Sequence, residues 1–360
     1  MKILLTGATG FVGSNILEFL VENHEVDEIY LILRSTSEQN ASSRFQDMVA
    51  ASNTIARHYN KVKLFNGDLS VRNFGLKENE YKFLTQQTNI VIHAAASTQF
   101  DLELTEAMKI NFDGTKHILD FSEACKEFKH LFYISTAYIV GNYPQVFKES
   151  DYNVNQKFEN SYEETKYLAE GEVRRGISSL HSTIIRPSIL IGDSQTGKVQ
   201  GFKVLYPFIK LIAQKALSII PCQSEACLNL VPIDYFNLIF SILFKYQLSK
   251  NKPSHLNIST STFHVINNQN AMIKDLIEYG CPILNIEAPL LVDPEKLPPQ
   301  RRRVIKRMFN HYFPYLNRPH LFDNSNTLKV AQHQCPIIGK DIIKNMLNYC
   351  CEVGYLNKHR

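Results

Sequence analysis

Tyr162 and Lys166 lie four residues apart in the segment NSYEETKYLAE, whose composition favours a helix. At this i, i+4 spacing both side chains lie on one face of a helix, one turn apart. A phenol has a pKa of about 10, too high for easy proton exchange at neutral pH. A neighbouring ammonium group favours the phenolate and so lowers that pKa. The pair could therefore give a proton to a carbonyl oxygen as a hydride reaches its carbon, although the spacing alone also fits an exposed helix face.

The segment before this pair supports the catalytic interpretation. The apolar run LFYIS predicts a buried strand, and the hydroxyl-rich segment STAY, which includes Thr136, stands at its carboxyl end. Ligands of an open α/β sheet bind at the carboxyl ends of the strands. We therefore expect the hydroxyl groups of Ser135, Thr136 and Tyr138 to reach one crevice with Tyr162 and Lys166, which favours a catalytic role for the pair. His93 ends another such run, IVIH, and we expect it to pack in a loop rather than to act as a base.

A glycine-rich loop follows the first predicted strand, KILLT, and precedes a helical pattern, FVGSNILEFLVE. Its spacing is GxxGxxG rather than the commoner GxGxxG. One glycine permits a positive φ, another lets the backbone approach a phosphate, and a third lets the helix pack closely on the sheet. The helix N-terminus then offers free N–H groups to a pyrophosphate. We expect a dinucleotide to contact Gly7, Thr9, Gly10, Phe11, Val12 and Gly13.

The end of the second predicted strand, LILRS, indicates which dinucleotide binds. NAD-binding proteins usually place Asp or Glu about 20 residues beyond the glycines, on the ribose hydroxyls. Arg34 occupies that place here, and a guanidinium group can form a bidentate pair with a 2′-phosphate. Arg44 could close the other side of the same phosphate. The two arginines favour NADP(H) over NAD(H).

The elements that position these residues alternate between short apolar runs and helix-length segments. Strands are predicted at Lys2 to Thr6, Glu28 to Leu33, Val62 to Asn66, Ile90 to Ala94, His130 to Ser135 and Thr183 to Arg186, and helices at Val12 to Val21, Leu104 to Phe121 and Tyr162 to Arg174. Runs that are apolar throughout are typical of strands buried on both faces of a parallel sheet. The pattern predicts an α/β fold with a Rossmann-type doubly wound parallel sheet.

After about residue 190 the alternation stops. Helices are expected at Phe202 to Leu217, Tyr235 to Tyr246, Ala271 to Tyr279 and Gly339 to Tyr355, a short strand at Thr262 to Ile266, and a loop entering a helix at Pro294 to Arg303. We expect residues 1–190 to form the NADP-binding domain, with 228–245 returning to it. Residues 191–360 should form mainly a smaller, mostly helical substrate-binding lobe.

Composition narrows the class of protein further. The net charge of +4 is too small to indicate nucleic-acid binding. The seven cysteines are scattered without a CxxC pair, which argues against a disulfide scaffold or a metal site and predicts a cytoplasmic protein. The amino-terminal apolar run is too short for a signal peptide, and no run approaches the length of a membrane helix. A peripheral membrane contact stays open, and nothing indicates the oligomeric state.

The motifs occur in an order that resembles the extended short-chain dehydrogenase/reductase superfamily. They are TGATGFVG, GDLS, VIHAAAS, NFDGT, STAY, YEETK, IIRPSILIGDSQTG and LVPIDYF. STAY, the GDSQTG and VPIDY segments, and Gln99-Phe100-Asp101 make the chain most similar to the branch of fatty acyl-CoA reductases and thioester reductases. The resemblance covers about residues 1–245. Acyl-CoA reductases of animals and plants carry a further C-terminal domain, and we expect this chain to be a free-standing soluble reductase instead.

The resemblance implies a role for individual residues. Thr136 would hydrogen-bond the substrate carbonyl, Tyr162 would donate the proton, and Lys166 would hold the nicotinamide ribose. The remaining cofactor contacts would be Asp68 and Leu69 at the adenine, Ala94 and Ala95 at the nicotinamide side, and Pro187 and Ser188 at the nicotinamide ring. Asn111 would have a supporting role. The implied reaction is NADPH-dependent reduction of an acyl-CoA or carrier-protein thioester to an aldehyde or alcohol, without a covalent enzyme intermediate.

Several interpretations remain open from the sequence. The apolar segment Val204 to Ile220 is either a core-facing helix or a wall of an acyl channel or membrane patch. The basic run Arg301 to Arg307 is either a solvated helix face or a site for CoA phosphates or an acidic carrier. A nucleotide-sugar epimerase or dehydratase, or a hydroxysteroid-type dehydrogenase, would share the same motifs. A non-catalytic NADP sensor is the alternative outside enzymes.

Overall fold

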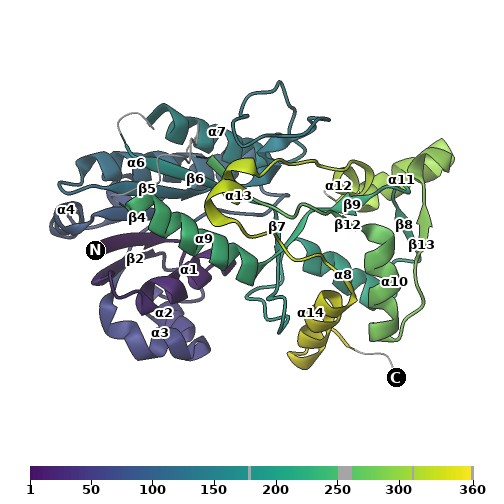
Figure 1. Cartoon of the computed structure of the whole chain (residues 1–360), viewed down its shortest axis with the longest axis horizontal. Helices are drawn as coiled ribbons and strands as arrows, with labels where there is room; N and C mark the ends of the chain where they lie inside the picture. Colours follow the sequence, from purple (N-terminus) through teal and green to yellow (C-terminus); the bar gives the residue numbers. More distant parts are fainter. Residues whose placement is uncertain (177–179, 250–261, 310–311, 358–360) are drawn as a thin grey trace.

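The computed structural model describes residues 1–176, 180–249, 262–309 and 312–357. Its centre is a seven-stranded parallel sheet with the strand order β11-β6-β5-β4-β1-β2-β3 (Figure 1). The strands are β1 (Lys2–Thr6), β2 (Glu28–Leu33), β3 (Val62–Asn66), β4 (Ile90–His93), β5 (His130–Ile134), β6 (Ser182–Pro187) and β11 (Thr262–Val265). The chain runs outward from β1 to β3 and then returns to the other side of β1 as β4. This confirms the predicted doubly wound sheet and places its switch point between β1 and β4.

The central strands β4 and β5 are fully buried because both faces of the sheet are covered there, whereas the edge strand β3 is partly exposed. Successive residues of a strand point to opposite faces, and the two faces accordingly pack in different clusters. Ile3 and Leu5 belong to one core, whereas Leu4 belongs to the other. The same division holds along β5, where Phe132 faces the first core and Tyr133 the second.

Helices form a layer on each face of the sheet. The first face is covered by α1 (Phe11–Glu22), α2 (Ala41–Ala51), α3 (Asn53–His58) and α9 (Ile233–Leu248), and the second by α4 (Glu78–Gln87), α6 (Gly114–Ala124) and α7 (Ser161–Gly176). Helix α9 comes from the carboxyl-terminal half of the chain, yet its phenylalanines pack with α1 and β5. Strand β11 and helix α13 (Ser325–Ala331) also join the sheet from that half. The division near residue 190 remains a prediction, but the sheet is completed by residues beyond it.

The remaining segments form a lobe with its own apolar core. Its helices are α8 (Leu205–Ala213), α10 (Ile273–Leu284), α11 (Pro299–Phe309), α12 (Phe313–Asn317) and α14 (Lys340–Glu352). Three small two-stranded sheets pair β7 (Ile189–Ile191) with β10 (Leu230–Pro232), β8 (Ile219–Pro221) with β13 (Leu290–Val292), and β9 (Cys227–Leu228) with β12 (Ala271–Met272). Helices α10 and α14 pack side by side at the end of the molecule opposite the N-terminus (Figure 1).

Several predicted bounds differ from the structure for local reasons. The helix expected at Phe202 to Leu217 is only Leu205–Ala213, because Val204 and Lys215 both adopt positive φ, which a helix excludes. The helix expected at Leu104 to Phe121 is divided into α5 (Leu104–Ala107), a π-helical segment at Met108–Asp113, and α6. The helix expected at Ala271 to Tyr279 begins only at Ile273, because Ala271 and Met272 form strand β12.

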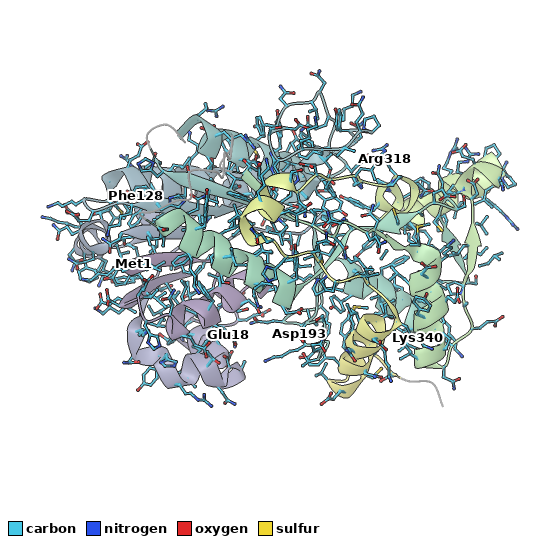
Figure 2. The ribbon with its side chains drawn as sticks, in the orientation of Figure 1. Met1, Glu18, Phe128, Asp193, Arg318 and Lys340 are labelled. Atoms are coloured by element: carbon cyan, nitrogen blue, oxygen red, sulfur yellow. The ribbon has the colours of Figure 1, made fainter. Side chains whose placement is uncertain are left out.

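The carboxyl ends of the central strands face the lobe. Met1 and Phe128, which precede β1 and β5, lie at the end of the molecule away from it, whereas Arg318 and Lys340 lie on the lobe side (Figure 2). No helix among the described residues is long and apolar enough to cross a membrane. Because the carboxyl ends of the strands face the lobe, residues from both can line one site.

Candidate active site

A cavity of about 230 Å³ lies between the carboxyl edge of the sheet and the lobe. It brings together ten of the predicted site residues, namely Gly10, Phe11, Val12, Gly13, Ala94, Thr136, Tyr162, Lys166, Pro187 and Ser188. The other predicted residues, Gly7, Thr9, Arg34, Arg44, Asp68, Leu69 and Ala95, lie outside its lining. The cavity thus joins the glycine loop to the Thr-Tyr-Lys group, and the arginines form a separate part of the site.

The glycine loop is shaped by two glycines with different constraints. Gly7 has a φ of +73°, and a Cβ there would lie 2.6 Å from the carbonyl carbon of Ala94. A Cβ on Gly13 would lie 2.1 Å from the carbonyl oxygen of Gly7, so this glycine allows α1 to pack against the loop. Gly10 is less confined, with its nearest neighbour at 3.3 Å. Any side chain at Gly7 or Gly13 would collide with this backbone, so both glycines are needed for the shape of the loop.

The first turn of α1 supplies donors to this loop. The first helical hydrogen bond is from the Ser14 amide to the Gly10 carbonyl, at 2.9 Å. The amides of Phe11, Val12 and Gly13 precede it, and such amides have no acceptor within their helix. These three residues line the cavity. Free amides at the positive end of a helix dipole suit a pyrophosphate, so the loop fits a dinucleotide.

Two guanidinium groups stand at the carboxyl end of β2. Arg44 donates to the Thr9 hydroxyl at 2.7 Å and to the Arg34 carbonyl at 2.6 Å, which ties α2 to the glycine loop. The Arg34 side chain is 54% exposed and lies 3.5 Å from Asp68. Burial raises the pKa of Asp68, but hydrogen bonds from Ser70 and the charge of Arg34 outweigh it and lower that pKa below its ordinary value.

Leu69, beside Asp68, packs against the start of α6. A Cβ on Gly114 would lie 3.6 Å from that of Leu69, and the Leu69 carbonyl bonds the His117 ring at 2.7 Å. Asp68 and Leu69 therefore flank the carboxyl end of β3 on the side of the arginines.

Thr136 and Tyr162 meet in the cavity. A hydrogen bond joins their side chains, and the Thr136 hydroxyl also lies 3.4 Å from the Pro187 carbonyl. Burial raises the pKa of Tyr162 to about 12, against a lowering effect of the Thr136 hydrogen bond. Tyr162 is therefore protonated at neutral pH.

Lys166 does not produce the lowered tyrosine pKa that the i, i+4 spacing alone predicts. Its ammonium group donates to the Ile134 carbonyl at 2.7 Å and lies 4.3 Å from the centre of the Tyr133 ring. Burial lowers the pKa of Lys166 to about 7, although the charge of Glu170 acts in the other direction. Tyr162 and Lys166 share a helix face, but desolvation has the larger effect on each pKa.

Asn111 connects the loop after β4 to helix α7. Its side chain accepts from the Ser97 amide at 2.8 Å and donates to the Ser97 carbonyl at 3.1 Å and to the Thr165 hydroxyl at 2.9 Å. It lies in the π-helical segment, and π-helical turns often occur at functional sites. Asn111 does not line the cavity, but its hydrogen bonds hold together two of the segments that surround it.

His93 lies in the core below the cavity. Its ring nitrogens pair with the hydroxyl groups of Thr6 at 2.7 Å and Thr115 at 3.1 Å. Burial lowers the pKa of His93 to about 3, so the ring is neutral at physiological pH. Both ring nitrogens form hydrogen bonds, and these bonds connect β4 to β1 and to α6.

A buried ion-pair network behind the cavity was not predicted from the sequence. Glu170 lies one turn after Lys166 on α7 and is fully buried. It accepts hydrogen bonds from Arg186 at 2.6 and 3.0 Å, from Ser135 at 2.6 Å and from Arg174 at 2.7 Å. Burial would raise the pKa of Glu170, but the two arginines outweigh it and hold that pKa at about 2.

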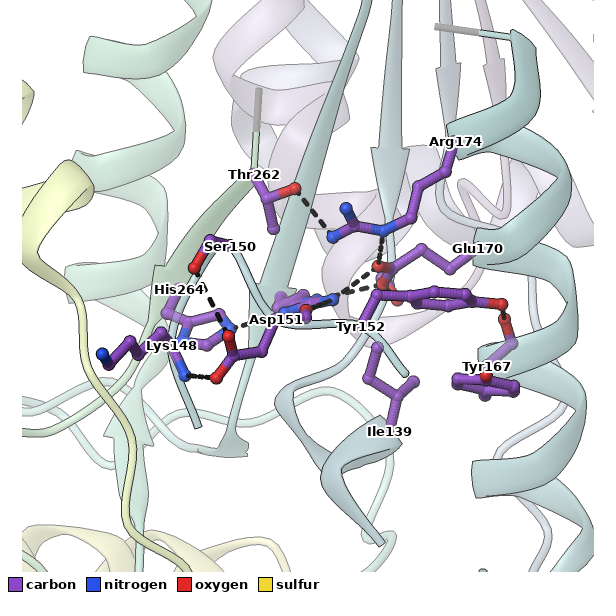
Figure 3. A network of polar contacts seen from close by, with 12 residues as sticks. Ile139, Lys148, Ser150, Asp151, Tyr152, Tyr167, Glu170, Arg174, Thr262 and His264 are labelled. Carbon is purple, nitrogen blue, oxygen red and sulfur yellow. Dashed lines mark hydrogen bonds and ion pairs between the residues drawn. The ribbon is translucent and has the colours of Figure 1, made fainter. Parts of the chain in front are cut away.

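The same network reaches the edge strand β11. Arg174 donates to Glu170 and, at 3.0 Å, to Thr262 (Figure 3). The Arg186 guanidinium lies 3.0 Å from the ring of His264. One signal in the sequence pointed to it: Glu170 follows Lys166 at i+4, and a carboxylate on the inward face of a helix requires a cationic partner. The network fixes α7, and with it Tyr162 and Lys166, against the sheet.

The lobe meets α7 on the other side of the cavity. Tyr315 of α12 donates to the buried carboxyl group of Glu163 and accepts from Asn160 at 2.7 Å. Arg318 forms an ion pair with Glu159 at 2.8 Å. The Tyr315 ring stacks on Phe100, with centroids 5.9 Å apart, and lines the cavity. The lobe thus packs aromatic side chains against helix α7 at the edge of the cavity.

The parallel sheet, the glycine loop at its switch point and the Thr-Tyr-Lys group define a class of protein, the NAD(P)-dependent oxidoreductases of the extended short-chain dehydrogenase/reductase type. The sequence profile of the male sterility protein family matches residues 5–238. The chain belongs to this family.

Relatives and solved structures agree with this assignment. The chain is 27% identical over 319 residues to fatty acyl-CoA reductase wat of Drosophila melanogaster, covering 78% of this chain and 61% of that protein. It is 25% identical over 307 residues to human fatty acyl-CoA reductase 1, covering 73% and 59%. The terminal R domain from the myxalamid PKS-NRPS biosynthetic pathway has the same fold, with a TM-score of 0.80, 22% identity, and coverage of 100% of this chain and 92% of that one. The chain therefore spans less than two thirds of either fatty acyl-CoA reductase.

Proposed function

We propose that this protein reduces the carbonyl group of an acyl thioester to an aldehyde, with NADPH as the reductant. The observation that carries the proposal is the composition of the cavity. Thr136, Tyr162 and Lys166 stand at its sheet side, whereas its lobe side is lined by apolar side chains such as Phe208 and Leu228. A polar reaction centre continuous with an apolar space suits a carbonyl group at the end of a hydrocarbon chain.

The residues that would hold the cofactor are arranged in two parts. The amides of Phe11, Val12 and Gly13 would bind the pyrophosphate, while Arg34 and Arg44 would bind the 2′-phosphate that distinguishes NADPH from NADH. Lys166, Pro187 and Ser188 would contact the nicotinamide end. When bound, the cofactor supplies the hydride.

The chain's own residues would act on the carbonyl oxygen. Thr136 and Tyr162 would donate hydrogen bonds to it, and these bonds strengthen as negative charge develops. Tyr162, with its raised pKa, holds its proton at neutral pH and would pass it to that oxygen. The hemithioacetal so formed would lose its O–H proton to the departing sulfur, leaving an aldehyde and a free thiol, and addition of a second hydride and proton would give an alcohol. Lys166, with a pKa of about 7, would supply the proton that replaces the one given up by Tyr162.

The names of two relatives support a thioester as substrate, because the Drosophila and human proteins are both called fatty acyl-CoA reductases. The thiol component would be CoA or a carrier protein. The arginine-rich helix α11 is one place where its phosphates could bind, since Arg301, Arg303 and Arg307 are exposed there.

A panel assay tests the proposal. NADPH absorbance is followed with acyl-CoAs, free aldehydes and nucleotide sugars as substrates, and NADH replaces NADPH in parallel. We expect oxidation of NADPH with acyl-CoAs and release of free CoA. A protein that is purified with tightly bound NAD, and that consumes NADPH with none of the thioesters, would instead be an epimerase or dehydratase of the same superfamily.

A further inference from the structure

A second cavity, of about 70 Å³, lies inside the lobe between α8, α10 and α14. We infer that it receives the far end of the substrate's acyl chain and that Gly280 of α10 determines how long a chain is accepted. This inference rests on the function proposed above and assigns a specificity residue to the same site.

The two cavities share a wall. Four residues, Leu205, Phe208, Leu228 and Leu316, line both of them. One layer of side chains therefore separates the Thr136–Tyr162 end from the interior of the lobe. Phe208 belongs to this layer, and its ring packs against Phe309 and Tyr312, with centroids 5.9 and 5.6 Å apart. A chain that leaves the reaction centre along the apolar wall meets this layer next.

The second cavity has the chemistry of a hydrocarbon site. None of its lining residues is charged or carries an amide or hydroxyl side chain; apart from Gly280 and the thiol of Cys281, they are isoleucines, leucines, one phenylalanine and one methionine. Polar cavities of this size hold water, whereas apolar ones stay dry and accept apolar ligands. Methylene groups are therefore the occupant that this lining favours.

Gly280 lies within helix α10 although the helix does not require a glycine there. Its φ is not positive. A Cβ at this position would meet only the Leu347 side chain, at 3.4 Å, which is ordinary van der Waals contact. Glycine in a helix interior is less stable than alanine. The glycine keeps the α10 wall open, and any longer side chain at this position would extend into the cavity or against α14.

The test compares two leucine variants of α10. Gly280→Leu adds a side chain at the cavity wall, and Glu278→Leu adds the same side chain at an exposed position two residues away. Binding of octanoyl-, dodecanoyl- and hexadecanoyl-CoA to the full chain is measured by calorimetry without NADPH, and turnover is measured with it. Each buried methylene contributes several-fold to affinity, so Gly280→Leu should weaken hexadecanoyl-CoA binding at least about tenfold and leave octanoyl-CoA within about twofold. Glu278→Leu should keep the wild-type profile.

A second variant covers the case in which Gly280→Leu does not fold, which circular dichroism and thermal unfolding would reveal. Phe208→Ala removes the ring between the cavities and should shift the preference toward longer chains. The inference is overturned if the wild type reduces acyl-CoAs but Gly280→Leu weakens the binding of all three acyl-CoAs equally. It is also overturned if Gly280→Leu and Phe208→Ala both keep the wild-type chain-length profile. A wild-type protein that neither binds nor reduces any acyl-CoA would overturn the proposed function itself.

Discussion

Tyr162 and Lys166 share a helix face, but burial moves their pKa values in opposite directions. Burial raises the pKa of the Tyr162 phenol to about 12 and lowers the pKa of the Lys166 ammonium group to about 7. A tyrosine that stays protonated at pH 7 is suited to donate a proton to an oxyanion, whereas a lysine near neutrality can both give and take one. The pair can therefore supply the proton that reduction of a carbonyl group consumes.

Removing the phenolic hydroxyl of Tyr162 tests this role. We expect Tyr162→Phe to lower kcat by about 10²- to 10⁴-fold, the usual contribution of a positioned acid, with the Kd for NADPH changed by less than about threefold. Stopped-flow fluorescence of bound NADPH gives the Kd, and absorbance gives kcat. Tyr143→Phe is the matched control, because its hydroxyl donates to Gln145 and its residue does not line the cavity. Equal losses in both variants would contradict a chemical role.

Arg34 carries the predicted preference for NADPH. Its side chain is 54% exposed, so solvent screens its pairing with a phosphate, and a moderate effect is expected. Arg34→Ala should raise the KM for NADPH about tenfold and leave the KM for NADH nearly unchanged. Arg57→Ala, at an exposed arginine of α3, serves as the control for general charge. A KM for NADH that rises as much as that for NADPH would remove Arg34 from phosphate binding.

At the scale of elements, α7 is held from two sides. Glu170 anchors its second half to β6 through Arg186, and Glu163 anchors its first turn to α12 through Tyr315. Glu163 lies within the turn that carries Tyr162 and Lys166, and Glu170 lies one turn beyond it. The helix orientation is thus set by polar contacts in addition to its apolar face.

The Glu170–Arg186 pair should be costly to break from one side. Both side chains are fully buried, and removal of one partner of a buried pair costs about 3–5 kcal/mol; because Arg174 still pairs with Glu170, the lower end of this range is expected. We expect Arg186→Met to lower the free energy of unfolding by about that amount in urea titrations. Arg175→Met, which breaks an exposed pair with Glu172 on the same helix, should cost less than about 1 kcal/mol. A similar cost for both would mean that the buried pair is not a principal support of α7.

The sequence predicted those elements whose burial leaves a periodic signal. Strands β1, β2, β4 and β5 are apolar along their length, and the helix with Tyr162 and Lys166 was placed to within two residues at either end. The paired strands of the lobe are only two or three residues long, too short for a period to be visible. The pairing of Glu170 with Arg186 depends on how α7 lies on β6, which local spacing does not reveal. For the same reason the sequence alone gave the wrong direction for the tyrosine pKa, since desolvation is a property of the assembled site.

At the scale of the whole molecule, the reaction centre is formed where the sheet and the lobe meet. The sheet side contributes the glycine loop and the Thr-Tyr-Lys group, and the lobe contributes Phe208, Tyr312 and Tyr315. Neither part encloses the cavity alone. The contacts that join them across α7 therefore link the stability of the fold to the shape of the site.

Glu163 makes this link dependent on pH. Burial raises its pKa from 4.5 to about 7, against hydrogen bonds from the Glu159 amide and Tyr315 that lower it. A carboxyl group that binds its proton more tightly in the folded state stabilises the fold fully below pH 4.5, and this contribution is lost as pH rises toward 7. Buried histidines such as His93, whose pKa is lowered, act in the opposite direction over an overlapping range.

The contribution of Glu163 must therefore be measured as a difference between two proteins. Glutamine keeps an oxygen that can accept from Tyr315 but does not titrate. We expect the unfolding free energy of Glu163→Gln, relative to wild type, to increase between pH 4.5 and 7 by up to about 3 kcal/mol, since each pKa unit corresponds to about 1.4 kcal/mol. Glu164→Gln, at the next position of the same helix, is the matched control for loss of a carboxyl group. A flat difference for Glu163→Gln would mean that this carboxyl group titrates alike in the folded and unfolded chain, and that the contact between α7 and the lobe is insensitive to pH.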